Sequence, residues 1–218
     1  MNSAADLSPP ILMRVRGLTF SYPPQRHVLT DWSHDFNGGI TWVRGSNGCG
    51  KSTLLKLLAG ALDAFTGEVE VLGLHVKEQP LPYRRSVFFC GPGPIVFDHL
   101  SPTEFFGFMR NLYPSVNNEA LAKHVQGFEL HPFLNSPLST LSTGTQRKVW
   151  LAIALCAGTP VTLLDEPLNA LDAKSLAHLR SALMECAHDH SRAWIVVSHE
   201  ALDAVSPLVT VLEMTPFG

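Results

Sequence analysis

Residues 45–53 read Gly45-Ser46-Asn47-Gly48-Cys49-Gly50-Lys51-Ser52-Thr53. They fit the pattern G-x-x-x-x-G-K-[ST] without a gap, and such a loop cradles phosphates when it lies between a strand and a helix. Both flanks agree, because the apolar run Ile40–Val43 precedes the loop and leucines at helical spacing follow it, at positions 54, 55, 57 and 58. The alternative is a glycine-rich turn that binds nothing. The register of Lys51 and Ser52 favours a nucleotide site.

Each group of this loop has an expected partner. Glycines at positions 45, 48 and 50 let the backbone pass close to a phosphate, so that its N–H groups point at phosphate oxygens. The helix that follows adds the positive end of its dipole. Lys51 is expected to reach the β and γ phosphates, and the Ser52 hydroxyl is placed to bind Mg²⁺.

Composition narrows the class of protein. The 218 residues are 45% hydrophobic and carry a net charge of -3, which suits one sizeable core, with or without a small subdomain, and argues against nucleic acid as the main partner. Residues 1–10 lack the build of a signal peptide, and the longest uncharged run, Val149–Leu164, is shorter than the ~20 residues of a membrane helix. We expect no membrane span. Four scattered cysteines predict reduced thiols rather than disulfides or zinc: Cys49, Cys90, Cys156 and Cys186.

Hydrophobic patterning predicts strands over residues 11–20, 28–36, 40–43, 68–73, 86–90, 161–164, 193–197 and 208–214. The connection 37–39, Asn-Gly-Gly, predicts a hairpin-like pair of the second and third of these. Helices are expected from the phosphate loop to Gly60 and from the region of Thr145 to Ala157. Residues 98–140 have helical spacing, and we expect a small helical subdomain inserted between two strands of the sheet. Its phenylalanines are expected to pack internally.

Tyr22 follows the first predicted strand and precedes a turn. An aromatic side chain at this place could stack on an adenine ring, a contact that contributes ~1–3 kcal/mol by analogy with base stacking. It could equally cover the edge of a sheet. Its position alone leaves both readings open.

Charged residues follow two of the buried strands. Asp165 and Glu166 come directly after residues 161–164, and carboxylates at the carboxyl end of a parallel strand lie at the ligand-binding edge of such a sheet. Asp165 suits the outer sphere of Mg²⁺, and Glu166 suits polarising an attacking water. His199 follows the strand 193–197 and reaches the same edge. A histidine in such a place is often a satisfied structural residue, but its location here favours a role in catalysis.

Taken in order, these motifs resemble those of the ATP-binding cassette (ABC) ATPases over nearly the whole chain. The resemblance rests on Tyr22, the phosphate loop, the Pro/Gly loop after residue 90, and four later motifs. The later motifs are Leu141-Ser142-Thr143-Gly144-Thr145, the run VTLLDE ending at Glu166, Asn169-Ala170-Leu171-Asp172 and the run VVSHE around His199. The chain is similar to exporter-type subunits, including the haem-export type.

The resemblance implies an α/β fold: an ATPase core with a mostly parallel sheet, an antiparallel β edge, and a helical subdomain (98–140) that ends at the signature motif 141–145. The whole chain 1–218 would be one nucleotide-binding domain. Two cassettes, as a homodimer or heterodimer, would enclose two ATP molecules, each with Mg²⁺. Ser142, Gly144 and Asp172 would then act on ATP held by the other cassette, and a helix start at Ser142 offers a hydroxyl, N–H groups and a dipole to a γ-phosphate.

Two features depart from the family pattern. The signature has Thr143 and Thr145 where glycine and glutamine are usual, and no glutamine occurs between Gln79 and Gln126. The family's loop glutamine would fall near Pro92 or Gly93, so its contacts with Mg²⁺ and water are missing.

Three functions fit this reading. The first is the ATP-hydrolysing subunit of a membrane transporter, a cytoplasmic protein held at the inner face of the membrane by a membrane-spanning partner chain. The second is a soluble cassette ATPase that remodels a non-membrane partner. The third is a nucleotide-gated scaffold with negligible turnover.

Overall fold

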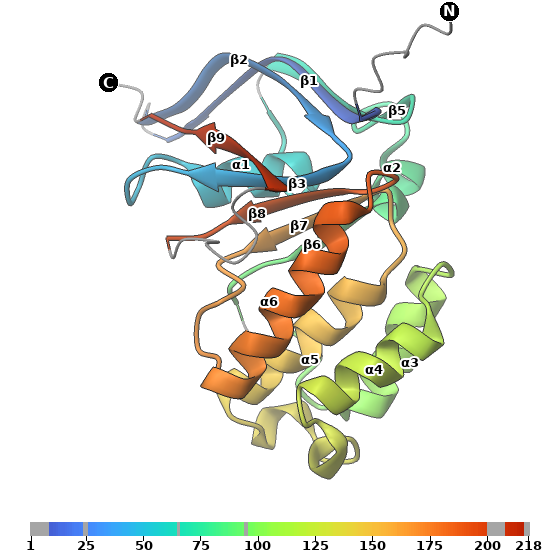
Figure 1. Ribbon diagram of the computed structural model, residues 1–218. Helices are drawn as coiled ribbons and strands as arrows, with labels where there is room; N and C mark the ends of the chain where they lie inside the picture. The colour runs from blue at the N-terminus through green and yellow to red at the C-terminus, as the bar shows by residue number, and fades with distance from the viewer. Residues whose placement is uncertain (1–8, 24–25, 65, 94–95, 200–207, 216–218) are drawn as a thin grey trace, which may run out of the picture.

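The computed structural model describes residues 9–23, 26–64, 66–93, 96–199 and 208–215, and it contains two β-sheets with helices between and beside them (Figure 1). Most of the segment 1–10, for which no signal peptide is expected, lies outside the described residues. The expected α/β fold with a parallel sheet and an antiparallel edge is confirmed. None of the described helices combines the length and the apolar character that crossing a bilayer requires.

The antiparallel sheet has the spatial order β2-β1-β4-β5, with β1 (Ile11–Tyr22), β2 (Arg26–Asn37), β4 (Thr66–Val71) and β5 (Leu74–His75). β1 buries Met13 and Val15 and, after a register shift between Val15 and Leu18, Leu18 and Phe20. β1 pairs with both β2 and β4, and Tyr22 lies opposite Arg26. The hairpin of this region is therefore the pair β1–β2.

The predicted hairpin between residues 28–36 and 40–43 is wrong. β3 (Gly39–Arg44) lies in the other sheet, where it pairs in parallel with β8 and β9, while β2 pairs with β1. The reason is burial: residues 39–43 are all buried, as expected of a central parallel strand covered on both faces. The glycine-rich connection passes from one sheet to the other instead of turning back on itself.

The parallel sheet has the order β6-β7-β8-β3-β9, with β6 (Val87–Cys90), β7 (Val161–Asp165), β8 (Ala193–Val197) and β9 (Val209–Glu213). Val197 of β8 lies opposite both Val43 of β3 and Asp165 of β7. The carboxyl ends of these three strands are thus level. The segments that follow them, which carry the phosphate loop, Glu166 and His199, meet at one edge of the sheet.

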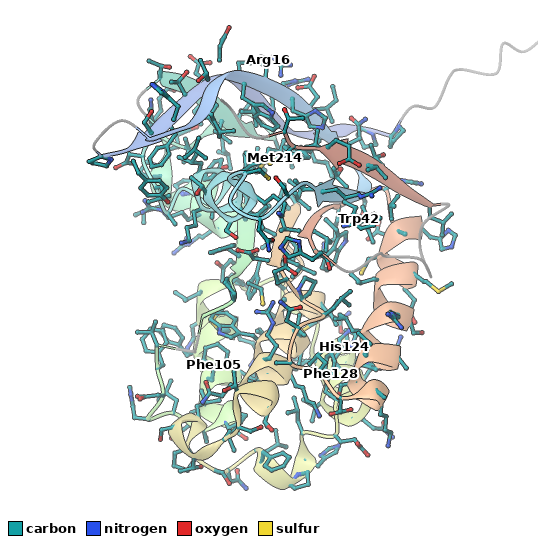
Figure 2. The ribbon with its side chains drawn as sticks, turned by 90° about the vertical axis from the view of Figure 1, so that its left-hand side faces the viewer. Arg16, Trp42, Phe105, His124, Phe128 and Met214 are labelled. Carbon is teal, nitrogen blue, oxygen red and sulfur yellow. The ribbon has the colours of Figure 1, made fainter. Side chains whose placement is uncertain are left out.

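Each face of the parallel sheet covers a separate core. Alternate residues such as Val43, Leu163 and Ile195 pack with α1 (Lys51–Leu58) and the antiparallel sheet. Their neighbours, such as Trp42 and Trp194, belong to the core of the helical side of the molecule. Figure 2 shows the two regions, with Met214 on the side of the antiparallel sheet and Phe105 and Phe128 among the helices.

The helical side comprises α3 (Pro102–Leu112), α4 (Asn118–Gly127), α5 (Thr143–Cys156) and α6 (Ala173–His188), with short 3₁₀ turns η1 (His131–Phe133) and η2 (Leu138–Thr140). A capping box begins α3, because Ser101 and Glu104 accept each other's backbone N–H groups. Phe105 and Phe106 are 0% and 5% exposed, which confirms internal packing for these two rings. The boundary of a subdomain at residues 98–140 stays a prediction.

One helix was not expected. α2 (Pro80–Ser86) has seven residues, two of them proline, and no apolar periodicity that could predict it. Its one buried side chain, Tyr83, is 0% exposed and donates its hydroxyl to the Leu58 carbonyl at the end of α1. A tertiary contact therefore holds this segment in place.

Candidate functional site

The phosphate loop joins β3 to α1 as expected. Gly50 precedes the helix with φ of 104°, a conformation that favours glycine, and a Cβ at this position would lie 2.4 Å from Cγ1 of Val28 on β2. The loop therefore needs glycine here both for its backbone angle and for its packing. Leu54 then begins the helical hydrogen bonding by donating its N–H to the Gly50 carbonyl at 2.8 Å.

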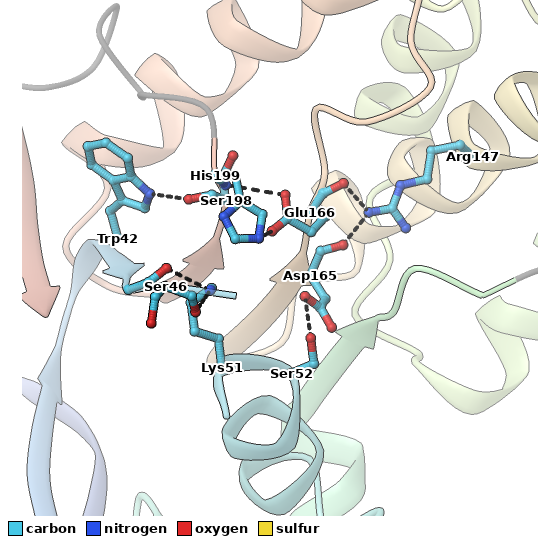
Figure 3. A network of polar contacts seen from close by, with 10 residues as sticks. Trp42, Ser46, Lys51, Ser52, Arg147, Asp165, Glu166, Ser198 and His199 are labelled. Carbon is cyan, nitrogen blue, oxygen red and sulfur yellow. Dashed lines mark hydrogen bonds and ion pairs between the residues drawn. The ribbon is translucent and has the colours of Figure 1, made fainter. Parts of the chain in front are cut away.

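Lys51 is held inside its own loop. Its side chain is buried, and Nζ donates to the carbonyl oxygens of Gly45 (2.9 Å) and Ser46 (3.0 Å) (Figure 3). A buried ammonium group needs such acceptors, since leaving it without hydrogen bonds would be very costly. The same contacts keep the charge at the mouth of the loop, where phosphate oxygens could take over from the carbonyls.

Asp165 lies directly beside the start of α1. Ser52 Oγ donates to Asp165 Oδ1 at 3.2 Å, and the aspartate is fully buried. Burial raises the pKa of Asp165 above its usual range, against the lowering effects of the Ser52 hydrogen bond and of the charges on Arg147, Lys56 and Lys51. The other oxygen, Oδ2, is buried and has no hydrogen-bond partner among the described residues. A serine hydroxyl beside an unpartnered carboxylate oxygen is a donor set that suits Mg²⁺.

Glu166 and His199 meet at the same edge of the sheet. Nε2 of His199 lies 3.2 Å from Oε1 of Glu166, and the His199 backbone N–H donates to Oε2 at 3.3 Å (Figure 3). The Glu166 side chain is 13% exposed, so its carboxylate is largely removed from solvent. Its backbone has φ of 51°, which is uncommon for a residue with a side chain. The Glu166 N–H donates to the Val197 carbonyl at 2.8 Å and fixes it to β8.

These groups surround one cavity of about 420 Å³. Nine of the predicted site residues line it: Tyr22, Asn47, Gly48, Gly50, Lys51, Ser52, Thr53, Glu166 and His199. Asp165 reaches it through Ser52. Gly45, Ser46 and Cys49 belong to the loop but do not line the cavity, and the side chain of Cys49 is buried.

Tyr22 ends β1 on the wall of this cavity. Its side chain is 37% exposed, its hydroxyl lies 3.4 Å from Thr53 Oγ1, and its ring meets Phe20 edge-on with centroids 4.8 Å apart. The ring is thus supported from one side and still accessible. Both readings of Tyr22 described above are compatible with this position, and stacking on a base stays a prediction.

The signature residues lie away from the cavity. Ser142 caps α5, because its Oγ accepts the Thr145 N–H at 3.2 Å and lies 2.9 Å from Thr145 Oγ1. A Cβ on Gly144 would lie 2.7 Å from the Ala170 carbonyl oxygen. Glycine therefore allows the start of α5 to pack against the loop between β7 and α6. Thr145, which departs from the family pattern, therefore completes the cap of its own helix.

Asp172 is fully engaged within the chain. It caps α6 by accepting the Ser175 N–H at 2.9 Å and the Ser175 hydroxyl at 3.1 Å, and it pairs with Lys148 of α5. The Lys148 hydrogen bond, followed by the Ser175 N–H, holds the pKa of Asp172 far below its usual range. Asp172 therefore joins α5 to the start of α6 in the single chain.

Three residues of this region were not among the predicted site residues, although Asn169 belongs to one of the motifs named above. Val28 and Asn169 line the cavity, and Arg147 lies behind Glu166. Nothing local marks Val28, since a valine in a strand is ordinary. A signal for Arg147 did exist: it shares the helical spacing of the buried residues Leu151 and Ala154, and an arginine on the buried face of a helix needs a partner.

A second cavity, of about 390 Å³, lies on the other side of Glu166 and Asn169. Gly93 lines it together with Thr143, Gln146 and Trp150. A Cβ on Gly93 would meet nothing within 4 Å. A side chain at Gly93, near which the family's loop glutamine is expected to fall, would thus enter open space in a cavity that Glu166 also lines.

The fold and the site together define a phosphate-loop nucleotide-binding protein, and comparisons with known proteins narrow this class. The family model described as "ABC transporter" matches residues 30–169, more than half of the chain. This chain belongs to the ABC transporter family.

Curated relatives and a solved structure agree with that assignment. The chain is 31% identical over 172 residues to the cytochrome c biogenesis ATP-binding export protein CcmA of Pseudomonas syringae, a match that covers 78% of this chain and 80% of that protein. It is 34% identical over 165 residues to the spermidine/putrescine import ATP-binding protein PotA of Roseobacter denitrificans, covering 74% of this chain and 45% of that protein. A solved ATP-binding subunit of an ABC transporter has the same fold, with a TM-score of 0.78, 23% identity, and 92% and 85% of the two chains covered.

Proposed function

We propose that this chain binds and hydrolyses ATP and thereby powers a membrane transporter whose membrane-spanning subunit is a separate chain. The observation that carries the proposal is the meeting of Lys51, Ser52, Glu166 and His199 around one cavity at the carboxyl edge of the parallel sheet. Family membership and the names of the relatives, which are ATP-binding proteins of export and import systems, support it.

ATP would bind with its phosphates on the loop. The loop N–H groups and the start of α1 would receive the phosphate oxygens, and Lys51 would exchange its two carbonyl partners for the β and γ phosphates. Tyr22, on the same cavity wall, would cover the base. Ser52 and Asp165 would hold Mg²⁺, which neutralises charge on the phosphates when it is bound.

Hydrolysis would take place at Glu166. The carboxylate is suited to orient a water and to accept its proton as the water oxygen bonds to the γ-phosphorus and the bond to the bridging oxygen breaks. His199 holds this carboxylate from two directions, through its ring and its backbone N–H. The products would be ADP, phosphate and a proton.

A second cassette would complete the site. Ser142 and Thr143 are exposed at the start of α5 and do not line the cavity that contains the phosphate loop of their own chain. Their helix end would therefore be free to meet ATP bound to another cassette, the same or a different chain. The match to the export protein CcmA, which covers 80% of that protein, favours an exporter-type subunit held at the inner face of the membrane by its partner.

The test compares the purified wild-type chain with Glu166→Gln and with Glu185→Gln, an exposed glutamate paired with Lys123 on the far side of the helices. We expect Glu166→Gln to bind ATP normally and to hydrolyse it ~10²–10⁴-fold more slowly, while Glu185→Gln behaves like the wild type. With Mg-ATP, light scattering should show Glu166→Gln as a dimer, because uncleaved ATP holds two cassettes together.

Other results would redirect the proposal. ATP binding with no hydrolysis in the wild type would favour the nucleotide-gated scaffold. If the chain hydrolyses ATP but no membrane-spanning protein copurifies with it from the membranes of the source cells, the soluble remodelling ATPase would be favoured.

A further inference from the structure

Arg147 is a buried arginine that joins three segments of the chain. It lies on α5 and is 7% exposed, and its two terminal nitrogens donate to backbone carbonyls (Figure 3). Nη1 donates to the Gly91 carbonyl at 2.5 Å, while Nη2 donates to the carbonyls of Asp165 (2.5 Å) and Glu166 (2.9 Å). Nη1 also donates to Cys90 Sγ at 3.6 Å, and Nε is buried without a hydrogen-bond partner among the described residues. One guanidinium group thus ties the signature helix to the loop after β6 and to the end of β7.

The charge of Arg147 has no carboxylate in direct contact among the described residues. Burying an ammonium or guanidinium group without an ion pair is costly, and the three carbonyl oxygens compensate for it only while they keep this arrangement. The planar fork of a guanidinium group can hold several acceptors at fixed angles. The interaction therefore restricts the backbone more than it adds to overall stability.

The segment it restricts is the one that carries Glu166. With φ of 51°, the Glu166 backbone is in a region that side chains disfavour, and such residues persist only when their surroundings hold them. The N–H of Glu166 is held by the Val197 carbonyl, and its C=O accepts from Arg147 Nη2 at 2.9 Å and from the Asn169 N–H at 3.3 Å. Without Arg147 only the longer of these two bonds would remain on the carbonyl, so the peptide would relax more readily toward an ordinary conformation and turn the carboxylate away from His199.

The loop after β6 has no side chain at Gly93 that could help to hold Glu166. Gly93 lines the cavity of about 390 Å³ that Glu166 also lines. Arg147 lines the same cavity and reaches the loop through Gly91. A movement of either the loop or α5 would therefore reach Glu166 through the guanidinium group.

We propose that Arg147 is a positioning residue for hydrolysis, which holds the Glu166 backbone in its left-handed conformation and passes the position of α5 and of the loop at Gly91 to the carboxylate. This inference rests on the proposed function for its activity readout, but its structural content is independent of that function. Arg147 does not line the cavity with the phosphate loop and is not expected to touch ATP.

The experiment compares Arg147→Lys and Arg147→Met with the same two substitutions at Arg192. Arg192 serves as the control, because it is half-buried and donates to the Thr159 carbonyl at 2.8 Å and to the Thr162 hydroxyl at 3.2 Å, next to the opposite end of β7. Each variant is measured for ATP affinity, for kcat, and for hydrogen exchange of the Glu166 amide.

We expect both Arg147 variants to keep the ATP dissociation constant and to lose about 10²-fold in kcat, with the smaller loss for lysine, which keeps the charge but lacks the fork. The Glu166 amide should exchange about tenfold faster in Arg147→Met, and the Arg192 variants should change neither quantity. In a Glu166→Gln background, Arg147→Met should cause little further loss of kcat, because both changes act through one carboxylate.

Two results would overturn the inference. The first is a loss of kcat on Arg147→Met that is as large in the Glu166→Gln background as in the wild type. The second is unchanged exchange at Glu166, or exchange and unfolding that rise equally in the Arg147 and Arg192 variants. If the wild type hydrolyses no ATP, the proposed function fails while the exchange measurement still tests the positioning of Glu166.

Discussion

His199 Nε2 lies 3.2 Å from Glu166 Oε1, and the backbone N–H of the same histidine donates to Oε2 of the same carboxylate at 3.3 Å. The two residues are 33 positions apart, at the ends of neighbouring strands β7 and β8. Because the strands are in parallel register, these contacts place the imidazole over the carboxylate without any other element. The pair forms one side of the cavity whose opposite side is the phosphate loop.

Removal of the imidazole should impair turnover more than binding. We expect His199→Ala to lower kcat by ~10²–10⁴-fold, because the carboxylate loses the ring that orients it, while the affinity for ATP changes little. His190→Ala serves as a control, since that histidine contacts the Gly38 carbonyl at the opposite end of β3. A variant that loses affinity and kcat together would show that His199 contributes to nucleotide binding instead.

Nucleotide binding should stabilise the chain through Lys51. At ATP concentrations of ~100 times the dissociation constant, binding should add ~2.7 kcal/mol to the free energy of unfolding. For a chain of this size that corresponds to a rise of roughly 5–11 °C in Tm by differential scanning fluorimetry. Lys51→Ala should abolish most of the rise, and Lys56→Ala on the same helix should retain it. An undiminished rise in Lys51→Ala would contradict the phosphate-loop assignment.

A glutamine introduced beside Glu166, the proposed catalytic carboxylate, should accelerate hydrolysis. Gly93→Gln places an amide in the cavity next to Glu166, where its Cβ meets no atom within 4 Å. One additional well-placed hydrogen bond to the water would raise kcat about tenfold, the equivalent of ~1.4 kcal/mol. Gly107→Gln, on α3, controls for the added side chain. Equal turnover of Gly93→Gln and the wild type would contradict this prediction. It would mean that Glu166, held by Arg147, already positions the water without a glutamine.

Stability should fall in mild acid because of a histidine pair on the helical side. His124 is buried with its Nδ1 3.1 Å from His178 Nε2, and burial, with smaller effects of His178 and Lys123 and an opposing one of Glu185, lowers its pKa to about 4. Since the unfolded chain takes up a proton near pH ~6.5 and the folded chain only near 4, the stabilisation is complete above ~6.5 and is lost as the pH falls toward 4.

This group alone should lower the free energy of unfolding by about 2 kcal/mol between pH ~7.5 and pH ~5. Urea titrations at the two pH values measure the loss. His124→Asn keeps a polar partner for His178 but cannot titrate, so its pH dependence should be smaller by that amount. His99→Gln, an exposed change, should leave the pH dependence as in the wild type.

Asp172 should matter for stability in the isolated chain. Asp172→Ala removes the cap of α6 and should lower the free energy of unfolding by ~1 kcal/mol, whereas Asp172→Asn keeps a capping oxygen and should cost less. Half of the side chain is exposed to solvent, so the loss of the Lys148 ion pair should contribute little in either variant. Chemical denaturation measures both. Weaker ATP binding by a monomeric Asp172→Ala chain of normal stability would place this aspartate in the nucleotide site of its own chain.

The sequence by itself determined the strands of the parallel sheet and the chemistry at their ends. Continuous apolar runs such as 193–197 are buried on both faces, and that requirement is visible locally as the absence of polar residues. The phosphate loop was predictable because its requirements are also local in the sequence. Its backbone shape depends on glycines within nine residues, and Gly50 has the positive φ that the pattern implies.

Tertiary structure alone decided which strands pair and which distant groups meet. β2 and β3 have the turn residues of a hairpin, yet they lie in different sheets, because the pairing of a strand depends on partners far along the chain. Asp172 and Ser142 became helix caps by local rules, but Lys148 reaches Asp172 only because the start of α6 lies near α5 in the fold. Arg147 is the clearest case. A helical spacing marked it as buried, but only the packing of α5 against the ends of β6 and β7 could supply the three carbonyl oxygens that hold it.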